Sequence, residues 1–206
     1  MGESKEFSDL EGEELVRMAR KAVTEYLQNH SKINDEVFDS KFDFRSGVFV
    51  TLNKQDSLRG CIGYPVAVKR LSRGLIDAAI SAATQDTRFN PVTLDELDKI
   101  VFEVTVLTTP VEIKVSKPSE YLSEIRIGRD GLIVENAFAS GLLLPQVPVE
   151  YNWNVKEFLE FTCQKAGLRK DAWEDKDTKI SRFQGVIFKE TSPNGSIIRE
   201  SPSHFL

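Results

Sequence analysis

The spacing of apolar residues predicts that helices and strands alternate along this chain. Apolar side chains recur every three or four residues in three segments, which is typical of helices that bury one face. These segments are 15–27, 71–83 and 155–166. Shorter apolar stretches predict strands at 58–62, 100–107 and 184–189. Two capping boxes, Ser8-x-x-Glu11 and Thr93-x-x-Glu96, each predict the start of a helix.

Turn signals predict how these segments connect. Residues 42–50, with Gly47 near the middle, predict two short strands joined by a turn. Asp130-Gly131 lies between alternating apolar residues and predicts a second hairpin at 125–134. Two prolines make 141–149 an edge strand or a loop.

The two halves of the chain repeat the same order of predicted elements. An offset of 84 residues (131 minus 47) maps Gly47 onto Gly131, and it also maps Leu75 onto Leu159. Each half reads as a hairpin, a third strand, a helix and a further strand. We therefore predict an α+β fold that arose by duplication, with repeats at about 42–107 and 125–190. The alternative is a chance similarity between two amphipathic helices that follow strands.

The composition predicts a soluble globular protein. Of the 206 residues, 40% are hydrophobic and 29% are charged, and the formal net charge is -5. This charge argues against a dedicated nucleic-acid binder, which usually carries a basic face. No apolar stretch approaches the ~20 residues that span a bilayer, and the polar N-terminus is unlike a signal peptide. Since two cysteines give no disulfide framework, we expect a cytoplasmic protein.

The sequence lacks the motifs that identify several families of enzymes. It has only two histidines, both in polar surroundings, and no CxxC, HExxH, GxGxxG or Walker-type phosphate loop. Zinc hydrolases, dinucleotide enzymes and P-loop NTPases are therefore not expected. We predict neither a metal nor a cofactor.

The stretch 58–63, "LRGCIG", carries the most distinctive chemistry. Because each glycine costs chain entropy on folding, Gly60 and Gly63 predict a backbone shape that other residues would not allow, and we expect a tight turn. Arg59 and Cys61 are two residues apart and share one face of an extended strand. The motif is either a reactive thiol beside a cation or a tightly packed structural turn.

Together with "AAISAATQDTRFNPVTLDEL" and "GLLLPQVPVEYNW", this motif resembles the AMMECR domain family. The family is named for a chromosomal region linked to Alport syndrome, midface hypoplasia and elliptocytosis. The resemblance runs from about Leu15 to about Glu190 and is that of an archaeal or bacterial-type member with a single domain. It implies one α+β domain at 1–192, with two unequal lobes around a cleft that contains the motif, and a C-terminal tail at 193–206.

The resemblance also limits what can be expected of the function, because the activity of the AMMECR family is not established. Microbial genes of the family resemble neighbours of the genes for radical-SAM and Memo-type proteins. This implies partners of those two kinds in a modification pathway.

Cys61 is the candidate catalytic residue. A nearby cation lowers the pKa of a free thiol from about 8.5, and Arg59 or Arg88 could supply that cation. However, no histidine is near to act as a base, and a free cysteine is commonly a small buried hydrophobe. We therefore favour a structural role for Cys61 over covalent catalysis.

Seven residues are candidates for ligand binding: Arg59, Gly60, Gly63, Arg88, Glu103, Gln146 and Glu150. Exposed N–H groups between the two glycines could bind an anion. Asp86-x-Arg88 either binds a ligand or holds the end of a helix. Glu103 interrupts a strand, so it lies on a solvated face or points at a cation. If the duplication is real, Gln146 and Glu150 face the motif across the cleft, and Trp153 either lines it or lies in the core.

These residues support two hypotheses of different classes. The first is a binding protein whose cleft holds a small anionic ligand or a segment of a partner. The second is an enzyme, or a subunit of one, that uses the Cys61 thiol. A factor associated with nucleic acid is a third possibility. The oligomeric state stays open.

Overall fold

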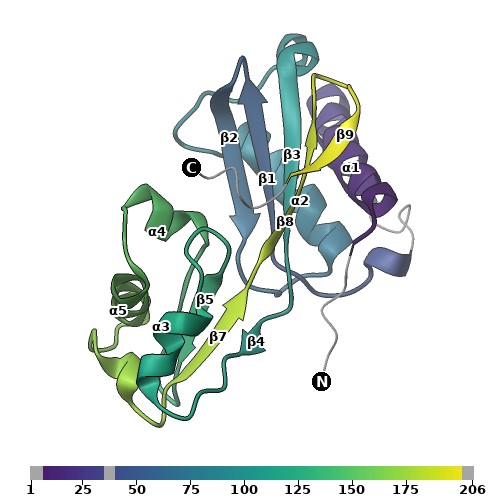
Figure 1. The fold of residues 1–206 in the computed structure, drawn as a ribbon. Helices are drawn as coiled ribbons and strands as arrows, with labels where there is room; N and C mark the ends of the chain where they lie inside the picture. Colours follow the sequence, from purple (N-terminus) through teal and green to yellow (C-terminus); the bar gives the residue numbers. More distant parts are fainter. Residues whose placement is uncertain (1–6, 35–39, 201–206) are drawn as a thin grey trace. The chain divides into compact units, whose positions relative to one another are not determined.

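The computed structural model describes residues 7–34 and 40–200. The described residues form two compact units, one made of the chain up to residue 107 and of 186–200, the other of 108–185. Each unit combines helices with a sheet, which confirms the predicted α+β class (Figure 1). Whether the two units make one domain, as expected for 1–192, stays a prediction.

The first unit contains a five-stranded sheet. Its strands lie in the order β2-β1-β3-β8-β9, so β2 and β9 are the edges. The strands are β1 Val48–Lys54, β2 Ser57–Tyr64, β3 Ile100–Leu107, β8 Gly185–Glu190 and β9 Ile197–Glu200. β1 pairs antiparallel with both β2 and β3. The three strands predicted at 58–62, 100–107 and 184–189 are therefore all present.

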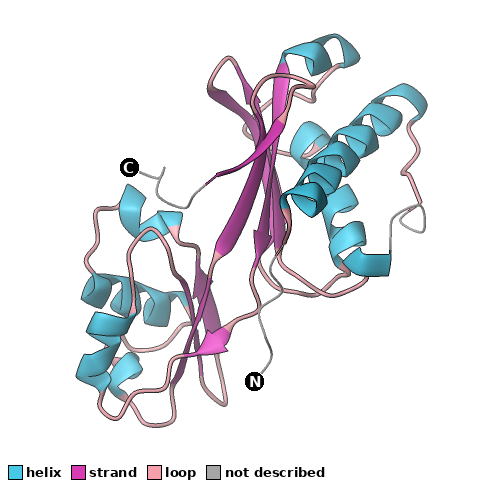
Figure 2. Cartoon of the chain, turned by 45° about the vertical axis from the view of Figure 1, so that its right-hand side comes forward, coloured by secondary structure: helices cyan, strands magenta, loops and turns pink. Residues whose placement is uncertain are grey.

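Two helices cover one face of this sheet (Figure 2). They are α1, Asp9–Asn29, and α2, Leu71–Thr84. α1 begins at the predicted capping box, where the Oγ of Ser8 accepts the N–H of Glu11 at 3.2 Å. Alternate strand residues, among them Val50 and Val104, are fully buried on this face. Among the described residues, no helix is both long and apolar enough to cross a membrane.

A buried ion pair ties α1 to the sheet. Glu190 of β8 is fully buried, and both of its oxygens accept from the Arg20 guanidinium, at 2.7 and 2.5 Å. Arg20 also donates to the carbonyls of Leu97 and Ile100, and Glu190 accepts the N–H of Phe102 at 3.0 Å. Because every charge in this cluster has a partner, it can remain buried.

The second unit contains a four-stranded sheet in the order β4-β7-β5-β6. The strands are β4 Val111–Glu112, β5 Gly131–Glu135, β6 Ser140–Leu143 and β7 Lys179–Phe183. The helices are α3 Tyr121–Glu124, α4 Gln146–Glu150 and α5 Val155–Lys165. Short 3-10 segments lie at Ser40–Phe42 and Leu94–Lys99 in the first unit, and at Pro118–Glu120 and Ala172–Glu174 in the second. Phe158, Leu159 and Cys163 of α5 form the core with Leu132 and Ile180.

Both predicted hairpins are wrong. Residues 42–47 precede β1, and the first hairpin instead joins β1 to β2 through Gln55-Asp56, whose φ angles are 51° and 58°. Its turn contains no glycine, so the usual signal is missing. Asp130 does not form a turn between strands either. Its buried carboxylate accepts from Arg129, from the Arg126 N–H and from Gln184.

Two further segments differ from the prediction. Residues 141–149 divide between the edge strand β6 and helix α4, which contains Pro148. Within the predicted tail at 193–206, residues 197–200 form β9, which pairs with β8. β9 was missed because Ile197-Ile198 is too short to give a periodic signal.

The units share one arrangement of elements. Each has a hairpin, at least one helix and then a strand that pairs with the first strand of the hairpin, so the orders β2-β1-β3 and β6-β5-β7 correspond. The predicted third strand of the first half is therefore the second strand of its hairpin. A common origin by duplication stays a prediction.

Candidate functional site

The motif 58–63 lies within the edge strand β2, and its glycines permit close packing. A Cβ atom on Gly60 would lie 2.2 Å from the carbonyl oxygen of Ala82 in α2. A Cβ on Gly63 would lie 2.3 Å from the ring of Phe49 on the neighbouring strand. Neither glycine has a positive φ angle. The expected tight turn is therefore wrong: the glycines allow β2 to contact α2 and Phe49 closely.

Arg59 forms an ion pair within the fold. Its Nη2 lies 2.9 Å from a carboxylate oxygen of Glu96, and its Nη1 donates to the carbonyl of Asn90 at 2.8 Å. Hydrogen bonds from Arg59, together with those from Lys54, lower the pKa of Glu96 to about 2. Arg59 therefore fixes the loop that precedes β3, and its charge is balanced by Glu96.

Asp86 and Arg88 cover the outer edge of β2. The buried carboxylate of Asp86 accepts the N–H of Cys61 at 2.8 Å, and the Arg88 guanidinium donates to the Cys61 carbonyl at 3.3 Å. Arg88 also holds Asp86 through two bonds, at 2.9 and 2.7 Å, which keep the pKa of that carboxyl well below its usual range. These side chains occupy backbone groups that an edge strand otherwise leaves unpaired.

The Cys61 thiol is half-buried and lies on the face of the sheet opposite the helices. Its Sγ is 3.3 Å from the Thr51 Oγ1. Burial raises the pKa of Cys61, and this outweighs the lowering by Thr51 and by the positive charge of Arg88. The predicted cation is thus close to the thiol, but the thiol form is favoured at neutral pH.

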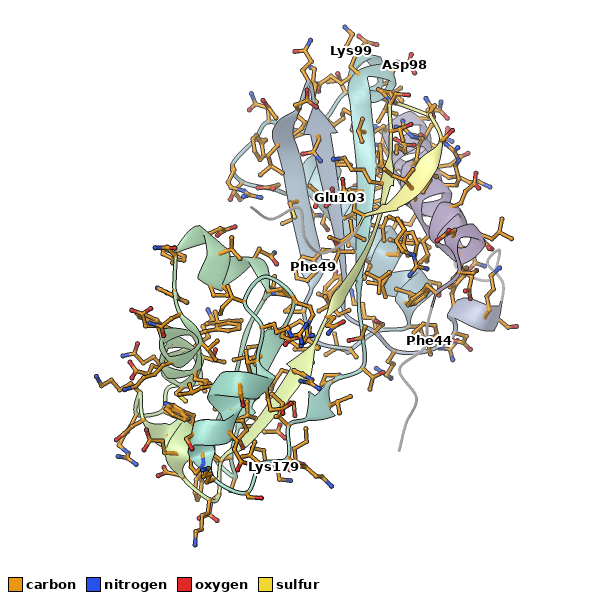
Figure 3. All side chains as sticks on the ribbon, viewed as in Figure 1. Phe44, Phe49, Asp98, Lys99, Glu103 and Lys179 are labelled. Carbon is orange, nitrogen blue, oxygen red and sulfur yellow. The ribbon has the colours of Figure 1, made fainter. Side chains whose placement is uncertain are left out.

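Strand register brings Glu103 to the same face. Thr51 pairs with Cys61 on one side and with Glu103 on the other, so the three side chains form a row across β2, β1 and β3. We call Cys61, Thr51 and Glu103 the outer-face row. Burial raises the pKa of Glu103, which is labelled in Figure 3, and Glu200 adds to this effect. In the part of the chain that the structure describes, no hydrogen bond reaches the Glu103 carboxyl.

A pocket of about 960 Å³ opens beside this row, entirely within the first unit. Thr51 and Glu103 line it, together with Lys189 and Glu200, whose charged groups are 3.5 Å apart. Asn53, Lys99 and Ile198 add amide, cationic and apolar surface. Volumes of this size are typical of small-molecule sites.

Gln146 and Glu150 lie at the two ends of α4 in the second unit. Gln146 is half-buried and Glu150 is exposed. Their proximity to the motif across a cleft stays a prediction. Trp153, which follows α4, is half-buried and stacks with two other aromatic rings.

Four residues of this region were not among the predicted site residues: Thr51, Glu96, Lys189 and Glu200. Thr51 alternates with buried Val50 and Leu52, so its strand pattern placed it on the opposite face, but only register shows its neighbours. Lys189 and Glu200 required the pairing of β8 with β9. In the described ranges, 7–34 and 40–200, no three His, Cys, Asp or Glu side chains gather to hold a metal ion.

Comparison with known proteins places the chain among archaeal relatives. The family model described as AMMECR1 matches residues 16–188. Protein MJ0810 of Methanocaldococcus jannaschii is 50% identical over 92% of this chain and 95% of its own length. A protein of Methanothermobacter thermautotrophicus is 53% identical, over 87% of this chain and 94% of its own.

A solved structure has a similar fold. The crystal structure of the uncharacterized protein PH0010 from Pyrococcus horikoshii has a TM-score of 0.76 and 48% identity. The match covers 94% of this chain and 98% of that one. The names of these relatives assign no activity, so the function must be argued from the site.

Proposed function

The chain belongs to the AMMECR1 family, and we propose that it binds a small ligand or a segment of a partner in the pocket beside the outer-face row. The ligand donates N–H hydrogen bonds to Glu103 and Thr51. The half-buried Glu103 carboxyl, which accepts no hydrogen bond from the described residues, carries this proposal.

The energetics of Glu103 favour a ligand that donates hydrogen bonds. Burial raises the pKa of Glu103, so its charged form is disfavoured while no hydrogen-bond donor of the described residues pairs with it. Lys189 is the nearby cation that lowers the pKa of Glu103, but Glu200 opposes it and itself pairs with Lys189. An amine or amide of the ligand would supply the missing bonds and stabilise the charged form.

The anionic ligand expected from the sequence has less support. Arg59, which suggested it, is paired with Glu96, and Arg88 is paired with Asp86. Carboxylates also line the pocket beside Lys99 and Lys189. We therefore place an amine- or amide-bearing ligand ahead of an anion.

A matched series of probes tests this choice. Titration of nitrogen-15-labelled protein with butylamine, butyramide and butyrate at equal ionic strength compares three head groups on one carbon skeleton. The amine and the amide should shift the backbone signals of Thr51, Cys61 and Glu103, whereas butyrate should not. Glu103→Gln should weaken butylamine binding about fivefold or more, through loss of the charge-assisted bond.

Glu200→Gln is the matched control, because Glu200 lines the same pocket but already pairs with Lys189. It should change butylamine binding less than Glu103→Gln does. Stronger shifts with butyrate, or unchanged amine binding in Glu103→Gln, would contradict the proposal.

An enzyme that uses the Cys61 thiol is the second candidate, favoured by the exposure of that thiol toward the pocket side of the sheet and by Arg88 nearby. Alkylation of Cys61 by iodoacetamide should then show an inflection well below pH 8. The raised pKa leads us to expect an inflection above the usual value instead. Radical-SAM and Memo-type partners stay a prediction that only the family resemblance supports.

A further inference from the structure

The pocket beside the outer-face row carries opposite charges at separate places along β3. Glu103 lies about half-way along that strand, and Lys99 lies immediately before its first residue, as the labels in Figure 3 show. At ~3.3 Å per residue of strand, the two residues are roughly 10–13 Å apart. A ligand that contacts both side chains is therefore elongated.

The Lys99 ammonium is available to such a ligand. Its side chain is exposed and lines the pocket, and within residues 7–34 and 40–200 it forms no hydrogen bond or ion pair. Lys189, the other lysine that lines the pocket, lies 3.5 Å from Glu200. Among the described residues, Lys99 is thus the lining cation whose charge no carboxylate balances.

Asn53 and Val101 lie between these two charges. They pair across β1 and β3, at the next position on the same face after the pair of Thr51 with Glu103, and both line the pocket. The Asn53 side chain has no hydrogen-bond partner in the described part of the chain, so its amide can bond a polar group of a ligand. The pocket thus presents a carboxyl, an amide and a cation, in that order along the strands.

A short peptide with free ends matches this order of groups. Its ammonium would bond the Glu103 carboxyl, its internal amide groups would bond Asn53, and its carboxylate would meet Lys99. An extended chain of three residues spans about 10 Å, which is close to the separation of Glu103 and Lys99. A single amino acid is too short to reach both charges.

One carboxylate disfavours this arrangement at the Lys99 end of the pocket. Asp56, in the turn between β1 and β2, is exposed and lines the pocket. Because Glu103 is half-buried, water and salt screen an ion pair with Glu103 less than one with Asp56. The ammonium of the peptide therefore favours Glu103, which leaves Lys99 to the carboxylate.

We propose that the ligand of this pocket is a free peptide of about three residues. The peptide lies along β3, with its N-terminus at Glu103 and its C-terminus at Lys99. This inference rests on the proposed function, because it uses the same bond from an amine to Glu103. It adds the second charged end, the length of the ligand and its direction along the strand.

Titration of the full-length, nitrogen-15-labelled protein with three forms of trialanine tests this inference. One form has free ends, one an acetylated N-terminus and one an amidated C-terminus, and all are used at equal ionic strength. The free form should shift the backbone signals of Thr51, Asn53 and Glu103. Acetylation should weaken binding about tenfold, through loss of the ion pair with Glu103, and amidation about threefold, because Lys99 is exposed.

Two variants test whether the carboxylate binds Lys99. Lys99→Met should weaken binding of free trialanine about threefold and leave binding of the C-terminal amide unchanged, because the amide has no charge to lose there. Asp56→Asn should tighten binding of the free form about twofold, through loss of a screened repulsion. Asparagine tolerates the φ of 58° at this position.

Lys21→Met is the matched control, since Lys21 is an exposed lysine of α1 and does not line the pocket. It should leave binding of every form unchanged. Equal binding of free and amidated trialanine, or equal binding of the free form to wild type and Lys99→Met, would overturn the inference. The proposed function would still stand in that case if butylamine shifts the Glu103 signal. If neither butylamine nor any of the peptides shifts it, both are overturned.

Discussion

The two units use the same packing device but present different chemistry. In each, a glycine on the second strand of the hairpin lies against the C-terminal end of a helix. A Cβ on Gly60 would lie 2.2 Å from the Ala82 oxygen, and a Cβ on Gly141 would lie 2.3 Å from the Ala166 nitrogen. The helix and the hairpin therefore meet in the same way in both units.

These two glycines define which residues of the two sheets correspond to each other on their outer faces. Gly60 pairs with Leu52, and Gly141 pairs with Val134. The outer-face row Cys61–Thr51–Glu103 then corresponds to Leu142–Ile133–Ser181. The row is aliphatic at two of three places in the second unit. The shared arrangement of strands therefore does not require polar side chains at these three positions.

The largest expected effect on the free energy of unfolding comes from removing a fully buried carboxylate. Two can be compared, Glu190 in the first unit and Asp130 in the second. Glu190→Ala leaves the Arg20 charge buried and unpaired, so it should cost about 3–5 kcal/mol of unfolding free energy. Asp130→Ala should cost less, because the Arg129 side chain is 32% exposed and water can solvate it. Urea denaturation measures both. A larger loss in Asp130→Ala would show that exposure of the arginine does not decide the cost.

Next come the glycines that define the comparison. Gly60→Ala and Gly141→Ala each place a methyl group against helix backbone, which cannot rotate away, so each should cost about 2–3 kcal/mol. Gly167→Asn is the control: Gly167 has a φ of 76° and open space around its Cα, and asparagine tolerates this conformation. Thermal denaturation checks all three. If only one of the two glycine variants is destabilised, the proposed correspondence between Gly60 and Gly141 is contradicted.

A smaller effect concerns Arg59, which pairs with Glu96 in the first unit. The folded-state pKa of Glu96 is about 2, below about 4.3 in an unfolded chain. The pair should therefore stabilise the fold above about pH 4.3, and this contribution should disappear as pH falls toward 2. Glu96→Gln should lose about 1 kcal/mol at pH 7 and show a flatter stability profile across that window.

Asp98→Asn is the comparison for Glu96→Gln, because Asp98 is exposed on the same 3-10 segment (labelled in Figure 3). It should change the pH profile much less in urea denaturation. Equal profiles for the two variants would remove the Arg59–Glu96 pair as the cause.

The smallest effect should be a gain in stability. Burial raises the pKa of Glu103, so between the unfolded and folded pKa values the folded state binds more protons and stability falls as pH rises. Glu103→Gln removes this penalty. The Tm at pH 7 should rise by about 2–4 °C, on the order of 1 kcal/mol, and should not rise at pH 4. A lower Tm at pH 7 would contradict an unfavourable burial of Glu103.

Periodic segments were predicted well because their signal is local. The helices at α1, α2 and α5 bury residues at every third or fourth position, and Ile100–Leu107 is rich in β-branched residues. The two hairpins were predicted wrongly because the local turn signal is absent where the first hairpin forms and present where no hairpin forms. Gln55-Asp56 adopts left-handed angles without a glycine, while Asp130-Gly131 carries a turn signal but is held by side-chain bonds.

The candidate site was predicted only in part. That Arg59 and Cys61 share a face stays a prediction, because the pairing of β1 with β2 shifts register between Leu52 and Asn53, next to Arg59. Which charge neutralises Arg59 depends on Glu96, 37 residues away, and no periodicity reports such a contact. Arg88 was expected to lie beside Cys61. It donates to the Cys61 carbonyl, although its ion-pair partner is Asp86.

By itself, the sequence determined the α+β class, the main helices and strands, the family, and Cys61 as the residue of interest. Tertiary structure alone decided what surrounds that residue. The register of β1 places Glu103 two strands from Cys61 with Thr51 between them, and the loop after α2 covers the edge of β2. Local patterns fix which face a side chain takes, because they follow backbone periodicity. Its neighbours, and hence its pKa and its possible ligands, follow from contacts between segments distant in the chain.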